Sequence, residues 1–204
     1  MEPTPESGVE RPAFPWWIAA LAVALVSFVG TFGTGLISED AAALRWVHEH
    51  GALADWCSSE YDLRSVLFWR PLVTTTLGVQ EALTGTAVEP LRLFNVGCHA
   101  LTAVLAGLLA LRLGGGRAGA LVASLLAALF PYSGGTVVWI VGRVDAQCAP
   151  LVLGALLLAL DGAFVGAFVI GFLALATKEI AFVLPAWGLL LACGRGDGPR
   201  AALR

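Results

Sequence analysis

A run of apolar and small residues at positions 14–37 contains no charged side chain. It exceeds the ~20 residues that a helix needs to cross the hydrocarbon core of a bilayer. Trp16 and Trp17 stand at its start, where aromatic side chains anchor helices at the membrane interface. The run therefore predicts a membrane-spanning helix.

Five further apolar runs follow, at residues 91–113, 118–130, up to Leu160, 163–176 and 180–193. The last runs have only ~14 to 16 residues, so each needs flanking polar residues to reach across a ~30 Å core. The chain is 58% hydrophobic and 13% charged, far more apolar than soluble domains. We predict an all-α, polytopic membrane helix bundle with about six transmembrane helices.

The polar segments predict which side of the membrane each connection occupies, and they divide the chain into three regions. Residues 38–65 mix charged and aromatic residues at partly helical spacing, and the Arg70-Pro71 step predicts a new element starting at Pro71. Arg112 and Arg117 flank a short connection, which favours the cytoplasm for that side. We predict a disordered cytoplasmic tail at residues 1–13, a transmembrane domain at 14–193 with an outer loop at 38–90, and a cytoplasmic tail at 194–204.

Composition excludes nucleic acid as a partner and allows one disulfide. A net charge of −3 provides no basic surface for nucleic acid, so we expect no nucleic acid partner. The four cysteines lack the C-x-x-C spacing of metal sites. A disulfide between Cys57 and Cys148 is one option for the outer side.

The predicted topology places four charged motifs on the outer side of the membrane. They are "SED" at 38–40, "WRP" at 69–71, "GRVD" at 142–145 and "TKE" at 177–179. Ionised residues beside apolar runs are costly, and those that persist usually face a protein interior or a water-filled cavity. We therefore expect one extracytoplasmic pocket lined by these motifs.

A polar stripe marks the second apolar run. Arg92, Asn95, His99 and Thr102 are spaced i, i+3, i+7 and i+10, which places them on one helical face. Such residues either line a site or provide hydrogen bonds between helices, as polar residues in membrane bundles often do. Both readings remain open for Asn95 and His99.

The remaining charges also have structural alternatives. Arg143 and Gln147 share a helical face, whereas Arg143 and Asp145 diverge if this stretch is helical, so Arg143 could pair structurally elsewhere. Lys178 and Glu179 could form an interfacial pair. Glu39 and Asp40 could simply open a loop helix, where acidic residues suit the N-terminal dipole.

Several motifs together resemble a known enzyme family. They are "FWRPL", "LFNVGCHALTAVL", "LFPYSGGTVVWIVGRVDAQCAPLVLGALLLAL" and "LATKEIAFVLPAWGLLL". Their order and spacing resemble the transmembrane and tetratricopeptide-repeat O-mannosyltransferases, which belong to the C superfamily of glycosyltransferases. The resemblance covers most of the chain from about Trp16 onward. It implies transfer of a mannose-like sugar from a polyisoprenyl-phosphate donor to a hydroxyl on an acceptor protein or glycan, within the lipid bilayer.

The resemblance also implies roles for individual residues. An acidic residue soon after the first transmembrane helix is the catalytic acid or base in that superfamily, which matches Asp40 first and Glu39 second. The donor phosphate needs cations, for which Arg70, Arg143 and Lys178 are the candidates. Asn95, His99, Asp145 and Glu179 are expected to support them, with Asp145 holding Arg143 or a neighbouring cation. No cofactor is predicted, and a divalent metal ion remains an option.

Members of that family carry more helices than this sequence, so we expect a fragment or a truncated copy without activity. The main alternative is a non-enzymatic lipid-binding or assembly subunit of the membrane. Half of a transporter is a weaker alternative, because the sequence contains no convincing internal repeat.

Overall fold

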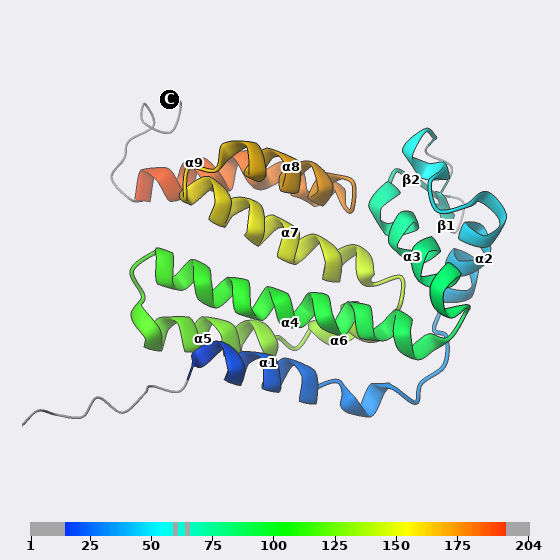
Figure 1. Cartoon of the computed structure of the whole chain (residues 1–204), viewed down its shortest axis with the longest axis horizontal. Helices are drawn as coiled ribbons and strands as arrows, with labels where there is room; N and C mark the ends of the chain where they lie inside the picture. The colour runs from blue at the N-terminus through cyan, green and yellow to red at the C-terminus, as the bar shows by residue number, and fades with distance from the viewer. Residues whose placement is uncertain (1–14, 59–60, 64–65, 195–204) are drawn as a thin grey trace, which may run out of the picture.

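The computed structural model describes residues 15–58, 61–63 and 66–194, and their fold is all-α apart from one short hairpin. The predicted tail at residues 1–13 and most of the tail at 194–204 lie outside these ranges. Six helices lie side by side and alternate in direction (Figure 1). They are α1 (Trp16–Val26), α4 (Val88–Arg112), α5 (Gly116–Ala128), α7 (Arg143–Leu160), α8 (Phe164–Leu175) and α9 (Leu184–Gly194).

The remaining elements connect these helices. They are the 3₁₀ helix η1 (Val29–Thr31), α2 (Asp40–His50), η2 (Ala54–Trp56), β1 (Tyr61–Leu63), β2 (Val66–Phe68), α3 (Pro71–Thr84), α6 (Ser133–Val138) and η3 (Glu179–Val183). In Figure 1, α2, α3 and the hairpin gather at one end of the six-helix body. We call this the loop end, and it is where the four charged motifs were expected to meet.

Two helices, α4 with 25 residues and α7 with 18, are long and apolar enough to cross a membrane. The helices α1, α5, α8 and α9 have only 11 to 13 residues. At 1.5 Å per residue such helices reach about 16 to 20 Å, well short of the ~30 Å hydrocarbon core. The structure therefore supports the all-α prediction. It does not support about six transmembrane helices, because two helices among the described residues meet the length criterion for a span.

The first apolar run is not one long helix, contrary to prediction. Helix α1 ends at Val26, and the Ser27 hydroxyl donates back to the Val23 carbonyl at 2.7 Å. Gly30, Gly33 and Gly35 follow, and glycine disfavours helix by roughly 1 kcal/mol per residue relative to alanine. These helix breakers end the helix well before Ile37, so the predicted continuous span over residues 14–37 is wrong.

Small residues let α1, α4 and α5 approach one another closely. Ala24 of α1, Ala100 and Ala103 of α4 and Ala128 of α5 form one buried cluster. A Cβ added to Gly107 would lie 2.2 Å from the Ser124 hydroxyl oxygen, so only glycine fits there. Contacts between small residues are typical of helix packing in membrane proteins.

Turn residues behave as the sequence predicts. Gly114, after α4, and Gly162, after α7, have φ of 87° and 77°, which glycine adopts without strain. Pro71 begins α3 as expected. The disulfide option is wrong, because Cys57 and Cys148 are both free, the first exposed and the second buried against Ala174.

Candidate functional site

Two ion pairs bring three of the predicted motifs together at the loop end. Lys178 pairs with Asp145, and Arg70 lies 3.5 Å from Glu179. The pairs connect the start of α3, the first turn of α7 and the segment between α8 and α9. Lys178 and Glu179 are adjacent, so both pairs form one cluster, which we call the ion-pair cluster.

Arg70 is held in place by its surroundings. Its backbone N–H donates to the Asp55 carboxylate at 2.6 Å, and its guanidinium carbon lies 4.0 Å from the centre of the Phe68 ring. The Arg70 side chain is 10% exposed and that of Glu179 is 65% exposed. A hydrogen bond from its own backbone N–H and then the Arg70 charge lower the pKa of Glu179. Glu179 therefore stays ionised at neutral pH.

Lys178 and Asp145 form the more central pair. Their side chains are 23% and 43% exposed, so water or a ligand can reach both. Asp145 thus pairs with a neighbouring cation, Lys178. Arg143 lies on another side of α7, as the helical spacing predicted.

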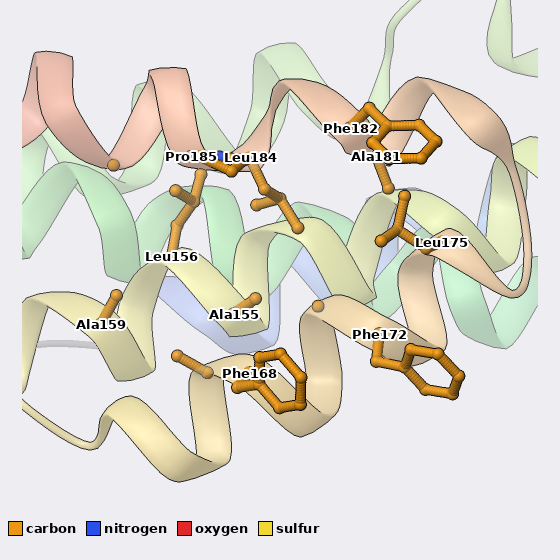
Figure 2. Close-up of a pocket in the computed structure, with 13 residues that line it drawn as sticks. Ala155, Leu156, Ala159, Phe168, Phe172, Leu175, Ala181, Phe182, Leu184 and Pro185 are labelled. Atoms are coloured by element: carbon orange, nitrogen blue, oxygen red, sulfur yellow. The ribbon is translucent and has the colours of Figure 1, made fainter.

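An apolar groove of about 440 Å³ lies between α7, α8 and α9 (Figure 2). Its walls include Phe168 and Phe172 of α8, Leu156 of α7 and Leu184 of α9. One end of the groove is formed by Leu175 and Ala181, which flank Lys178 in the chain. Lys178 is three residues from each of them, so the ion-pair cluster lies near this end of the apolar groove.

Asp40 is buried and serves the backbone. One carboxylate oxygen accepts the Ile37 N–H and the other accepts the Val141 N–H, both at 2.9 Å. Burial raises the pKa of the Asp40 carboxyl, and these two N–H donors oppose that rise. Its side chain is 0% exposed. In this geometry Asp40 joins the segment after η1 to the segment before α7, and no face of it is open to a substrate.

Glu39 has the more accessible carboxylate of the predicted pair. It lines a shallow pocket of about 380 Å³ with Ser38, Trp139 and the glycines Gly134 and Gly135 of α6. The Ser38 hydroxyl donates to Glu39 at 2.6 Å. Ser38 has a φ of 52°, the one positive φ outside glycine among the described residues. Strained backbone of this kind is concentrated at functional sites.

Arg143 lies outside the ion-pair cluster. It is 0% exposed and donates to Gln80 at 2.6 Å, to Thr76 at 3.3 Å and to the Leu91 carbonyl at 3.2 Å. Its guanidinium carbon is 4.7 Å from the Phe94 ring centre. These contacts tie α7 to α3 and α4. Sequence reasoning missed Thr76 and Gln80, although their i, i+4 spacing in "TLGVQ" signals one polar face on α3.

The polar stripe of α4 shares one face, as predicted, and it binds backbone carbonyls. Arg92 donates to the carbonyls of Thr31 and Thr34 at 2.8 and 2.9 Å. Asn95 donates to Trp139 at 2.9 Å, and His99 contacts the Ala128 carbonyl at 3.0 Å. These bonds fix to α4 the segment after α1, the end of α5 and the segment between α6 and α7. Of the two roles considered from sequence, this is the one in which the stripe provides hydrogen bonds between helices.

The predicted residues thus divide into four groups. Arg70, Asp145, Lys178 and Glu179 form the ion-pair cluster, Glu39 lines a separate pocket, and Asp40, Asn95 and Arg143 lie buried in the scaffold. His99 lines a third pocket together with Asp145. Among the described residues, no three His, Cys, Asp or Glu side chains are grouped to hold a metal ion. Because Asp145 and Glu179 are each paired with a cation, we assign no step to a metal.

No protein-family model, curated protein or solved structure matches this chain.

Proposed function

We propose that the chain is a multi-pass membrane protein whose loop end lies outside the cytoplasm. Large apolar side chains are exposed along its helices, including Val122 and Leu126 of α5 and Val165 and Phe168 of α8. Lipid is the environment in which such faces are stable. The opposite end carries Arg112 and Arg117 in a short connection, which favours the cytoplasmic side.

Within this setting, we propose that the protein is a polyisoprenyl-phosphate-sugar-dependent glycosyltransferase related to the C superfamily. One observation supports it most: an apolar groove ends beside Lys178, with Arg70 in the same cluster. An isoprenoid chain needs an apolar channel, and its phosphate needs a cation at the end of that channel. Lysine is a compact charge that can serve a phosphate while remaining near its carboxylate partner.

Glu39 is the reacting carboxylate in this proposal, and Asp40 is a positioning residue. The Glu39 carboxylate takes the proton of an acceptor hydroxyl, whose oxygen forms the new bond to the anomeric carbon. The bond between that carbon and the phosphate oxygen breaks, and polyisoprenyl phosphate leaves with the electron pair. Asp40 holds the segments on both sides of the Glu39 pocket through Ile37 and Val141.

The test uses the full chain in lipid nanodiscs with a polyisoprenyl-phosphate mannose and a hydroxylated acceptor. Release of polyisoprenyl phosphate and mass gain of the acceptor measure turnover. Glu39→Gln should abolish turnover and leave donor affinity unchanged, because the amide cannot take the proton. Donor binding without turnover in the unaltered protein would reject the enzyme and retain the lipid site.

A non-enzymatic lipid-binding or assembly subunit is the second candidate. It is favoured by the separation of the Glu39 pocket from the groove, since each is lined by different residues. A binding protein requires the groove and the ion-pair cluster but no reacting carboxylate. Under this alternative Glu39→Gln changes neither binding nor stability.

A further inference from the structure

A third pocket, of about 410 Å³, lies between α4, α5, α6 and α7, and its lining includes neither Lys178 nor Glu39. Its polar lining comes from Thr102, Ser133, Thr136, His99 and Asp145. We call it the acceptor-rich pocket, because most of these groups already donate their hydrogens to the backbone and keep free lone pairs.

The hydrogens of the serine and threonine hydroxyls of this pocket are already committed to the backbone. Thr102 donates to the Cys98 carbonyl at 2.9 Å, Ser133 to Phe130 at 2.6 Å and Thr136 to Ser133 at 2.9 Å. A hydroxyl that donates its one hydrogen keeps lone pairs as acceptors. His99 Nε2 faces the Ala128 carbonyl at 3.0 Å, which requires the hydrogen on Nε2 and leaves Nδ1 an acceptor in the neutral ring. The pocket therefore offers a ligand mainly acceptors.

Aromatic surface accompanies these acceptors. Phe130 and Tyr132 both line the pocket, and their ring centres are 5.7 Å apart. Tyr132 is 79% exposed, so its ring is accessible at the rim. A ring whose edges carry hydroxyl donors and whose faces carry C–H groups matches this combination of acceptors and aromatic rings.

The charges that line the pocket favour a neutral hydroxylated ligand over a cationic one. Asp145 is the carboxylate of the pocket, and its Oδ1 already pairs with Lys178. A second cation would compete with Lys178 for a charge that is largely neutralised. A neutral, polyhydroxylated ring meets no such competition, and it can donate to Asp145 while a linked phosphate approaches Lys178.

The acceptor-rich pocket and the apolar groove also lie along one face of α7. Asp145 and Ala149 line the pocket, and Leu156 and Ala159 line the groove. These four residues are spaced i, i+4, i+11 and i+14, which is a single helical stripe. A molecule with a polar head, a phosphate and an apolar tail could follow this stripe from the pocket, past Lys178, into the groove.

We infer that the acceptor-rich pocket binds the hexose ring of a lipid-linked sugar phosphate, with Asp145 and Thr102 accepting hydrogen bonds from its hydroxyls. This inference rests on the proposed function for the phosphate and the tail. It adds the subsite for the sugar and the residues that recognise it.

The test compares three probes on the full chain in nanodiscs: geranyl phosphate, geranyl-phosphate mannose and free mannose 1-phosphate. The mannose-bearing lipid should bind at least 10-fold more tightly than geranyl phosphate. Thr102→Val should weaken binding of the mannose-bearing lipid by about 3- to 10-fold, the effect of one hydrogen bond, and leave geranyl phosphate unchanged. Thr84→Val is the matched control, because Thr84 also donates to a carbonyl four residues earlier but lies exposed at the end of α3.

The outcomes separate this inference from the function on which it rests. Equal affinity for the two lipids would overturn the sugar subsite and leave the lipid-phosphate site intact. Failure of both lipids to bind would overturn the proposed function and the sugar subsite with it. If free mannose 1-phosphate binds as tightly as the mannose-bearing lipid, the ligand is a free sugar phosphate and the lipid-linked assignment is wrong.

Discussion

Asp40 and Val141 are joined by a 2.9 Å hydrogen bond from the Val141 N–H to a fully buried carboxylate, across 101 residues of sequence. The second carboxylate oxygen accepts the Ile37 N–H. One side chain thus holds the segment after η1 against the start of α7. Asp40 therefore has a scaffold role in this structure, although its position in the sequence suggests a catalytic one.

Asp40→Asn should therefore destabilise the fold. The amide retains one acceptor oxygen but turns an N–H₂ group toward a second backbone donor, which leaves a buried N–H unpaired. We expect the free energy of unfolding to fall by about 1 to 3 kcal/mol, measured by denaturant unfolding in detergent micelles. Glu39→Gln, one residue away, should change it by less than about 0.5 kcal/mol. Equal stability of the two variants would contradict the scaffold role.

Arg143→Met should also act on stability and spare the lipid site. It removes the guanidinium that donates to the Gln80 side chain and the Leu91 carbonyl, which leaves two buried acceptors without this donor. We expect the free energy of unfolding to fall by about 2 kcal/mol or more. Arg112→Met is the control, because Arg112 is half-exposed and pairs with Asp161 at the other end of the body. Geranyl phosphate affinity of the folded fraction should not change. A tenfold loss of that affinity would return Arg143 to the phosphate site.

Lys178→Met should weaken binding of geranyl phosphate by about 10-fold, since it removes one charge-assisted contact at the end of the groove. Lys178→Arg keeps the charge and should retain most of the affinity. Isothermal titration in nanodiscs measures both. If Lys178→Met binds the probe as well as the unaltered protein, the groove does not place a phosphate at the ion-pair cluster.

The Arg70 and Glu179 pair should give an acid-dependent stability. Because the folded state lowers the pKa of Glu179, its contribution is fully present above the ordinary pKa of about 4.5 and is lost as pH falls through the lower folded value. The difference in Tm between the unaltered protein and Glu179→Gln should stay constant from neutral pH down to that ordinary value and then narrow. Glu49→Gln on the exposed face of α2 is the matched control. A difference that narrows already near pH 6 would contradict the assignment.

The proposed topology predicts opposite labelling of two exposed cysteines. Cys57 follows η2 at the loop end and Cys193 lies in the last turn of α9, while the direction of the six helices places them at opposite ends. In intact cells a membrane-impermeant maleimide should modify Cys57, whereas Cys193 should react only after permeabilisation. Substituting serine for the other cysteines isolates each signal. Labelling of Cys193 alone in intact cells would reverse the orientation.

The sequence by itself determined the local features of this protein. Proline at 71 and glycines at 114 and 162 defined one helix start and two turns, because their effects act on the backbone of the residue itself. The spacing of Arg92, Asn95 and His99 was sufficient to place them on one face of α4, since helical periodicity is a local property. The alternation of apolar runs and charged connections also predicted that "WRP", "GRVD" and "TKE" gather at one end.

Only the tertiary structure decided what those polar residues contact. Asp40 and Arg143 have the residue types of a glycosyl-transfer site, yet both are buried with partners on segments far away in the sequence. Asp145 and Lys178 pair because α8 returns its following segment to the first turn of α7. Burial and pairing of a charge depend on which helices pack together, and this packing is set by long-range contacts that no local pattern contains.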